Sequence, residues 1–234
     1  GGQAILDTHL AGGELVSAEL ARYQGAEGAP LQLVRRDPPF AGRTLVYDPS
    51  DPFLARAAAA LHETTVEEGT AGTLVRFRYR EADGQGIVRT YTFGKDYTLG
   101  LKVQREGSVA GRVAVVLGPG IGNPSKAELD SQYTKPGSSV TLSASRSVSR
   151  NVKDGLKEPQ VVGTGLIAAG LEDNYFVTAF LPGEKETVTL RPVALAAPAA
   201  PPAEGTVPPA ATAPLAETEV VAAAEGTLRT GVYL

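Results

Sequence analysis

The stretch "TLVRFRYRE", Thr73 to Glu81, indicates the fold because its side chains alternate strictly between two kinds. In an extended chain, successive side chains point to opposite faces. One face here is apolar and the other is cationic: Val75, Phe77 and Tyr79 against Arg76, Arg78 and Arg80. The pattern predicts an antiparallel strand with one buried face and one face in water.

The same period of two continues in the segments that follow. "GIVRTYTFG" predicts a strand from Ile87 to Phe93, and "DYTLGLKVQ" predicts another over 97–104. Turn residues separate the three segments, at Ala82–Gly84 and at Gly94–Asp96. Together the three segments predict an antiparallel meander.

Apolar or alternating runs recur along the rest of the chain. Further strands are predicted over 4–10, 14–23, 31–34, 44–47, 112–118, 139–145, 161–171, 175–181 and 187–193, and on both sides of Glu225-Gly226. Helix signals are few. Asp51–Glu63 begins with a suitable N-cap and a proline, and a strand is possible after it; Ser125–Tyr133 begins with a Ser-x-x-Glu capping box. We predict an all-β, antiparallel fold with one or two short helices.

The run "YFVTAFLP", Tyr175 to Pro182, predicts a strand in the middle of a sheet. Thr178 is the only polar residue before the proline, so both faces of the strand are expected to be buried. Pro182 is expected to end the strand. We therefore interpret Glu172–Asn174 as the turn that leads into a core strand, rather than as the edge of a pocket.

The length of 234 residues suits one domain, and we predict that 1–234 is a single domain. Within it, most residues of 194–215 are Ala or Pro. Such a tract cannot bury enough side chain to order itself. We expect a flexible Pro/Ala-rich loop that leaves one strand after Val193 and returns to its neighbour near Glu217. Its deletion should leave the melting temperature nearly unchanged.

Composition narrows the possible functions. The net charge of −4 and the acidic pI give no sign of a nucleic-acid partner. The absence of Cys excludes disulfides, thiolate nucleophiles and Cys-based zinc sites. No apolar run is long enough for a transmembrane helix. Because Met is also absent, we interpret the chain as an excised fragment or a processed product.

Motifs for catalysis or for binding a cofactor are weak. His9 and His62 lie far apart and form no metal-binding spacing, so we interpret both as ordinary surface or hydrogen-bonded histidines. The glycine-rich segment 118–125 lacks the spacing of a phosphate loop. Asp48 and Asp51 resemble a carboxylate pair but lie in a turn cluster, where Asp commonly bonds its own backbone. We predict no catalytic, metal or cofactor site, and no enzyme.

The cationic row Arg76, Arg78 and Arg80 is the candidate partner-docking face. The three side chains project together from one face of a strand, so an anionic ligand or partner could bind them. The alternative is an ordinary solvated sheet face, on which long side chains cover their neighbours. The residues themselves leave both interpretations open.

Four motifs, in order along nearly the whole chain, resemble the large periplasmic domain of the bacterial YidC membrane protein insertases. They are a Gly-Gly turn before a strand ending in Leu-x-x-Tyr, a hairpin rich in Tyr and Phe, a Tyr-Phe strand that ends in Pro, and a closing "GTLRTGVYL". The matching residues are Gly12, Gly13, Leu20 and Tyr23; Tyr91, Phe93, Tyr97 and Leu99; and Tyr175, Phe176, Ala179 and Pro182.

This resemblance implies a β-supersandwich similar to the galactose mutarotase-like domains. It also implies a location on the periplasmic side of the bacterial inner membrane, between the first two membrane helices of an integral membrane protein. In the family that it resembles, the full protein inserts and folds membrane proteins, with or without the Sec translocon, through its membrane-embedded part. We therefore expect an accessory domain that docks Sec translocon components (SecDF or SecYEG) or nascent membrane proteins.

A carbohydrate-binding or mutarotase-like domain is the alternative function. Mutarotase-like enzymes need a general base and a general acid, commonly Glu and His, that converge in a cleft. Here His9 and His62 are the available histidines, and Glu63 adjoins His62. Trp, which commonly stacks on sugar rings, is absent. The residues, together with the resemblance, favour the interaction domain, although fold alone does not imply function.

Overall fold

The computed structural model describes residues 4–9, 12–24, 30–34, 44–46, 48, 50–69, 72–93, 98–107, 111–118, 138–152, 156–172, 177–195 and 215–233. The helix predicted at Ser125–Tyr133 lies outside these residues, as does nearly all of the glycine-rich segment 118–125.

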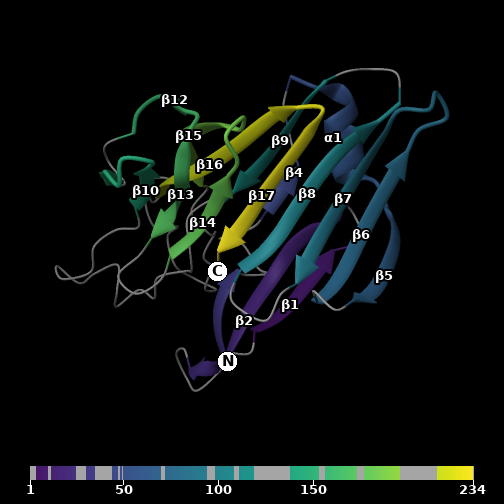
Figure 1. Ribbon diagram of the computed structural model, residues 1–234, viewed down its shortest axis with the longest axis horizontal. Coiled ribbons are helices and arrows are strands. Elements are labelled where there is room, and N and C mark those ends of the chain that lie inside the picture. The colour runs from purple at the N-terminus through teal and green to yellow at the C-terminus, as the bar shows by residue number, and fades with distance from the viewer. Residues whose placement is uncertain are drawn as a thin grey trace, which may run out of the picture.

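Two large antiparallel sheets make up the fold (Figure 1). The first has eight strands in the order β1-β2-β4-β9-β16-β15-β12, and β3 also pairs with β2. Its strands are Ala4–His9 (β1), Glu14–Gln24 (β2), Pro30–Val34 (β3), Thr44–Val46 (β4), Arg112–Leu117 (β9), Gln160–Gly163 (β12), Thr187–Leu195 (β15) and Leu215–Glu225 (β16).

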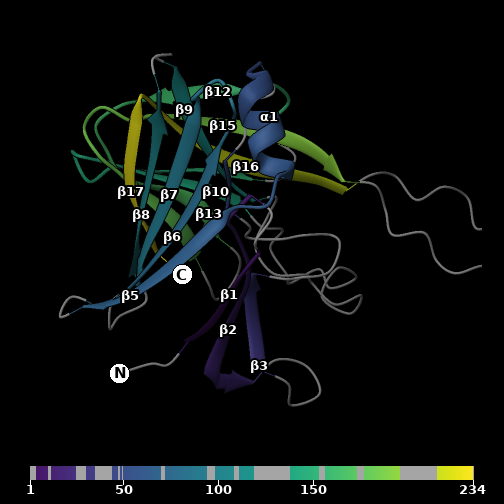
Figure 2. The same ribbon diagram turned by 90° about the vertical axis from the view of Figure 1, so that its right-hand side faces the viewer.

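The second sheet has nine strands in the order β11-β10-β13-β14-β17-β8-β7-β6-β5. They are Glu63–Gly69 (β5), Gly72–Arg80 (β6), Gly86–Phe93 (β7), Thr98–Glu106 (β8), Ser138–Ser143 (β10), Val148–Val152 (β11), Leu166–Glu172 (β13), Val177–Pro182 (β14) and Thr227–Tyr233 (β17). Figure 2 shows β5 to β8 and β17 as one curved layer, while β1, β2 and β3 of the first sheet lie at the lower end of the molecule. The prediction of an all-β antiparallel fold is confirmed.

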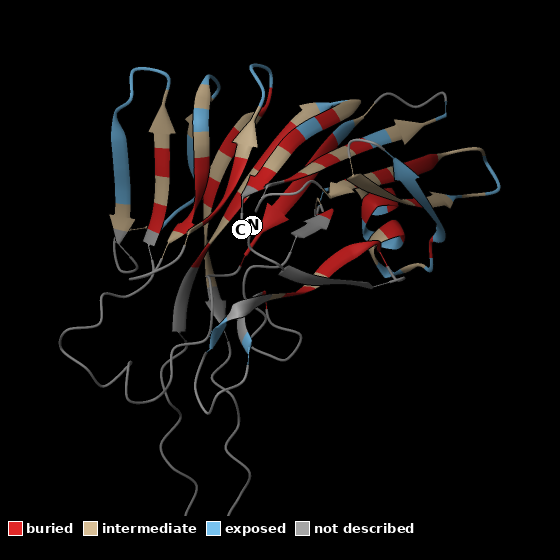
Figure 3. Cartoon of the chain, turned by 60° about the horizontal axis from the view of Figure 1, so that its bottom comes forward, coloured by how far each residue is buried: buried red, intermediate tan, exposed pale blue. Residues whose placement is uncertain are grey.

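The core lies between the two sheets, and the meander supplies much of it. Alternate residues of β6, β7 and β8 face inward, which Figure 3 shows as bands of buried and less buried residues along the strands. The fully or nearly fully buried members of the core include Phe77, Ile87, Tyr91, Leu99, Leu101 and Val103, which cluster with Val113, Val115, Leu117, Val220 and Ala222 of the first sheet. Val75 and Tyr79 are partly buried and pack against this core.

One helix, α1, spans Pro52–Ala59 and is shorter than the predicted Asp51–Glu63. Its start is as predicted: the Asp51 carboxylate accepts from two backbone N–H groups of the first turn, at 2.9 and 3.3 Å. Its end differs because Ala60 is extended and Glu63 already pairs with β6. The strand that the sequence allowed after the helix therefore forms, and it begins at Glu63, the last residue that was assigned to the helix.

The single strand predicted over Val161–Leu171 is wrong. The segment contains two strands in different sheets: β12 pairs with β15, whereas β13 pairs with β10 and β14. Gly163 has φ +106° and Gly165 has φ +72°, which are conformations that residues with a Cβ rarely adopt. The two glycines therefore let the chain turn from one sheet into the other.

β14 lies between β13 and β17 inside the second sheet, as the apolar run predicted. Thr178, Ala179 and Phe180 are all buried, so the strand is covered on both faces. Pro182 is its last paired residue, opposite Thr230. The predicted beginning of the strand at 175–176 lies outside the described residues.

β15 and β16 pair antiparallel as far as Leu195 opposite Leu215. The ladder therefore continues beyond both Val193 and Glu217, where the sequence placed the ends of the Pro/Ala-rich loop. Residues 196–214 lie outside the described residues, so their flexibility stays a prediction.

Gly12 fits the turn between β1 and β2 because it has no Cβ. Its φ is +70°, and its N–H donates to the Ala60 carbonyl at 2.9 Å. A Cβ at this position would lie 2.6 Å from the Ala58 carbonyl oxygen. The turn can therefore lie against the end of α1 only with a glycine in this place.

We predict that Gly12→Ala lowers the free energy of unfolding by about 2–4 kcal/mol, because it adds a backbone clash to the cost of a left-handed conformation. Gly226→Ala is the matched control: its φ is +67°, and nothing lies within 4 Å of the added Cβ. That variant should lose about 1–2 kcal/mol. Urea unfolding measures both losses, and equal losses would contradict the close contact between Gly12 and the end of α1.

We also predict that a short Gly-rich turn can replace residues 196–214 without lowering the melting temperature. Leu195 and Leu215 are already paired, so a short turn can join them without changing the ladder. Shortening the loop about fourfold should lower its closure cost by about 1 kcal/mol. A clear fall in the melting temperature on thermal unfolding would show that the removed residues stabilise the domain.

Candidate functional site

The predicted cationic row lies on the outer face of β6, where two of its three members form ion pairs. Arg76 Nη1 is 3.4 Å from a Glu67 carboxylate oxygen on β5. Arg78 donates from Nε and Nη2 to one oxygen of Glu106 on β8, at 3.0 and 2.8 Å. These pairs hold the two side chains across the neighbouring strands, as on a solvated sheet face.

The Arg78–Glu106 pair crosses β7 at a glycine. Gly86 is the ladder partner of both Arg80 and Glu106. A Cβ on Gly86 would lie 3.3 Å from the Cβ and from Oε2 of Glu106, so a larger residue would crowd this carboxylate. The glycine therefore leaves room for the ion pair to bridge three strands.

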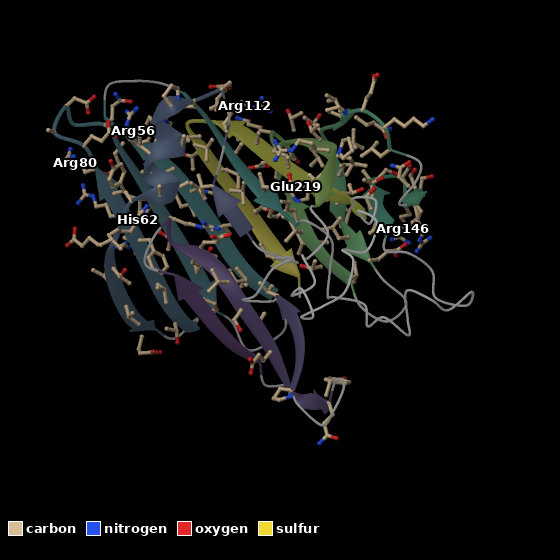
Figure 4. The ribbon with its side chains drawn as sticks, turned by 180° about the vertical axis from the view of Figure 1, so that it is seen from behind. Arg56, His62, Arg80, Arg112, Arg146 and Glu219 are labelled. Carbon is tan, nitrogen blue, oxygen red and sulfur yellow. The ribbon has the colours of Figure 1, made fainter. Side chains whose placement is uncertain are left out.

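Arg80, at the end of β6, is exposed and forms no ion pair with a described residue. Figure 4 shows it at the same end of the molecule as Arg56 and far from Arg146. Arg56 donates to both carboxylate oxygens of Glu81, at 2.8 and 2.9 Å, and this contact lowers the pKa of Glu81. Arg80 is thus the member of the row that is most open to a partner.

His62 lies beneath α1 and is 8% exposed. Its Nε2 is 2.9 Å from the Ala57 carbonyl oxygen, so this nitrogen carries a proton that it donates to the helix. Its ring stacks on Tyr79, with centroids 5.7 Å apart. Burial lowers the pKa of His62, and the nearby Arg89 cation lowers it further, against the effect of the Ala57 hydrogen bond. The neutral ring is therefore the form that fits this site.

Arg89 is a buried cation that the sequence analysis missed. It is 1% exposed, and its guanidinium lies 5.0 Å from the centre of the Tyr91 ring. Its Nη1 points to the Gly12 carbonyl at 3.5 Å, and the Tyr91 hydroxyl donates to the Gly13 carbonyl at 3.1 Å. Burial lowers the pKa of Arg89, whereas Tyr91 and Glu14 favour its charged form. Arg89 and Tyr91 together fasten the turn between β1 and β2 to β7.

The alternation of β7 contained a signal for Arg89. Ile87, Arg89 and Tyr91 share one face, and Ile87 and Tyr91 are large apolar residues. A cation that takes the middle place among alternating apolar residues is predicted to be buried with them, even though arginine is rarely buried without a partner. Residue type alone predicts the opposite, an exposed side chain.

A small cavity of about 10 Å³ lies between His62 and Arg89, and its other walls are Gly12, Val46, Ala57, Ala58 and Ile87. This space is about that of a single water molecule. The buried Nδ1 of His62 has no hydrogen-bond partner among the residues that the structure describes. The arrangement suits a structural water under α1 and is far too small for a sugar.

The two aspartates behave as the turn interpretation predicted. Asp48 accepts from the backbone N–H and the hydroxyl of Ser50, at 2.9 and 2.6 Å. Asp51 caps α1 and also accepts from Arg105 Nη1 at 2.6 Å. Burial acts to raise the pKa of Asp51, but the contacts with Arg105 and with backbone N–H groups lower it overall. Both carboxylates therefore have structural partners.

The other predicted site features are also placed by the structure. The backbone of His9 pairs with Glu14 in the β1–β2 ladder, while its side chain lies outside the described part. Glu63 is exposed on the outer face of β5, opposite Arg78, and does not share a site with the buried His62. The described residues contain no group of three potential metal ligands. They also contain no helix with the length and hydropathy needed to span a membrane.

The two facing antiparallel sheets define a galactose mutarotase-like sandwich, as the resemblance implied. A candidate mutarotase from Salmonella typhimurium, YeaD, has a similar solved structure, with a TM-score of 0.51. The alignment covers 99% of this chain and 87% of that one, at 12% identity. At this identity the likeness concerns the fold and not the activity.

The family follows from the sequence itself. The family model of the YidC periplasmic domain matches residues 5–224, nearly the whole chain. This chain therefore belongs to the YidC periplasmic domain family, as its four motifs suggested. A search of the curated proteins gave no match.

We predict that the domain loses stability as the pH falls below about 6.5, because His62 has a lowered pKa in the folded state. Above this pH, the ring is neutral in both the folded and unfolded states, so the protonation of His62 does not lower the free energy of unfolding. Below it, the unfolded chain binds the proton first, so the free energy of unfolding falls by up to about 1.4 kcal/mol per pH unit. The fall ends at the folded-state pKa. Urea unfolding between pH 8 and 5 measures it.

His62→Gln is the matched variant for this prediction, because its side-chain amide can still donate to Ala57 and does not titrate. Its stability should be flatter with pH than that of the parent chain in the same window. An equal slope in both proteins would assign the effect to other groups.

Proposed function

We propose that this chain is the periplasmic accessory domain of a membrane protein insertase in the bacterial inner membrane. In this role it assists the insertion and folding of inner-membrane proteins, with or without the Sec translocon. The observation that carries the proposal is the match of the YidC periplasmic domain model over residues 5–224. The proposed role places the insertion step in the membrane-embedded part of the full protein.

We further propose that the domain has no chemistry of its own. Acid–base catalysis of the mutarotase kind needs a His and a Glu that meet at a substrate. His62 is buried, and its Nε2 proton is used by the Ala57 carbonyl. Glu63 is on the outer face of β5. The adjacent pair in the sequence therefore points in two directions.

The outer face of β6 to β8 is the proposed docking surface for Sec translocon components or nascent membrane proteins. Arg76, Arg78 and Arg80 form one row on it, and Lys102 lies two strands from Arg76 on the same face. Glu67 and Glu106 neutralise part of this row, whereas Arg80 has no acidic partner among the described residues. Electrostatic attraction of an anionic segment is therefore strongest around Arg80.

We predict that a photocrosslinking residue in place of Thr90 captures a partner in native membranes. Thr90 is the ladder partner of Arg76, so the probe sits within the proposed surface and leaves its arginines intact. Expected products are Sec components or nascent membrane proteins. Arg80→Glu in the same background should reduce their yield several-fold, since it reverses the exposed charge.

Thr189 on β15 provides the matched control, because it is a partly buried threonine of the other sheet. Equal yields from positions 90 and 189, or none from position 90, would contradict the docking surface. Anomerisation of hexoses by the purified chain would contradict the proposal of an accessory domain without chemistry.

A further inference from the structure

The second sheet ends in an open strand edge. β5 is the terminal strand of this sheet, and Figure 1 shows it at the right-hand margin beside β6. All seven of its residues are exposed, so none of the described residues covers the strand. About every second residue of an edge strand directs its backbone N–H and C=O away from its neighbour. β5 therefore presents a row of unpaired backbone groups.

This edge is more regular than the other described edges. β5 pairs with β6 without a register shift from Glu63 opposite Arg78 to Gly69 opposite Gly72, and it contains no proline. At the far end of the same sheet, β11 is shorter. In the first sheet, β12 has a bulge between Val161 and Gly163. Bulges and short strands discourage the addition of a further strand, and β5 has neither.

The charges on β5 select the kind of strand that can be added. Its glutamates Glu63 and Glu67 share the outer face with the arginine row of β6. A further strand would lie about 5 Å from the glutamates and about 10 Å from the arginines. Because directly opposite charges stabilise a cross-strand pair and like charges destabilise it, cationic residues fit this position. The inner side is different, because Val66 is there, 62% exposed, next to Val75.

A second copy of this chain is a poor occupant of the edge. Two β5 strands joined side by side would bring Glu63, Glu67 and Glu68 of each copy into one ladder. Six carboxylates would then lie along the joined edges, with no cation on either strand. Charge complementarity therefore favours a different chain.

We propose that the open edge of β5 binds an extended peptide segment with Lys or Arg at alternate positions and apolar residues between them. The segment adds to the second sheet as a tenth strand, with its cations against Glu63 and Glu67 and its apolar side chains against Val66. Its backbone hydrogen bonds supply affinity, and the alternation supplies selectivity. This surface is distinct from the proposed docking surface around Arg80.

The binding test uses the 234-residue chain and a short fluorescein-labelled peptide of alternating Lys and Val. Fluorescence anisotropy should show saturable binding that weakens with added salt. A matched peptide of alternating Glu and Val should bind about tenfold more weakly or worse. Equal binding of the two peptides would overturn the proposal.

A backbone-modified peptide separates strand addition from simple charge attraction. N-methylation of alternate residues along one edge of the Lys-Val peptide keeps every charge but removes the hydrogen bonds on that edge. Methylation of the edge that faces β5 should weaken binding about tenfold or more, and hydrogen exchange should show that the unmodified peptide protects amides of β5. Full binding by peptides methylated on either edge, or protection confined to other strands, would overturn the proposal.

A chain variant locates the site. Glu63→Gln combined with Glu67→Gln should weaken binding of the Lys-Val peptide about tenfold, because the shape of the edge is kept while the two carboxylates that face the peptide's cations lose their charge. Glu184→Gln with Glu225→Gln is the control, since both are exposed glutamates outside β5, and its affinity should be unchanged. Equal effects of the two variants, or a β5-dependent dimer in sedimentation, would overturn the proposal. Either result would leave crosslinking from Thr90, and with it the proposed function, standing.

Discussion

The turn at Gly12-Gly13 is the constraint on which the arrangement of the two sheets depends. It belongs to the first sheet, yet its backbone groups are bound by α1 and by the second sheet. Gly12 donates to Ala60 at the end of α1, while Arg89 and Tyr91 on β7 reach the two glycine carbonyls. Both glycines have positive φ, and a Cβ on either would lie within 3 Å of a neighbour. The turn is therefore the place where the first sheet, α1 and the second sheet are held together.

That position also explains why a charged residue can be buried here. Arg89 lies over Tyr91 and close to the Gly12 carbonyl, and Glu14 favours its charged form from the start of β2. A buried ion is costly unless such partners are in place. The neutral His62 lines the same small cavity as Gly12 and Arg89, and it donates a hydrogen bond to α1. The contacts that fix the helix and those that fix the turn therefore lie around one cavity. Polar contacts under α1 thus orient the sandwich, whereas apolar burial supplies most of its stability.

The sequence predicted the strands well because their side-chain period is local. Residues 73–80 carry their own burial pattern, and the apolar run before Pro182 indicated a central strand. The period does not say which sheet a strand joins, so the break at Gly163 and Gly165 was missed. The candidate site was harder to predict from the sequence than the strands were. The arginine row was recognisable, but its glutamate partners come from β5 and β8. Contacts between strands depend on how the strands pair, which the pattern of one segment does not reveal.

The last described residues of the chain join both sheets at their centres. β16 lies between β15 and β9, and β17 lies between β14 and β8, although β8 and β9 are formed more than a hundred residues earlier. Neither sheet can reach its final order until this hairpin is available. Contacts so distant in sequence slow folding, because a long loop must be closed before they form. A chain that emerges N-terminus first therefore holds β8 and β9 with open edges until β16 and β17 have been synthesised, and it is most exposed to misassembly during that interval.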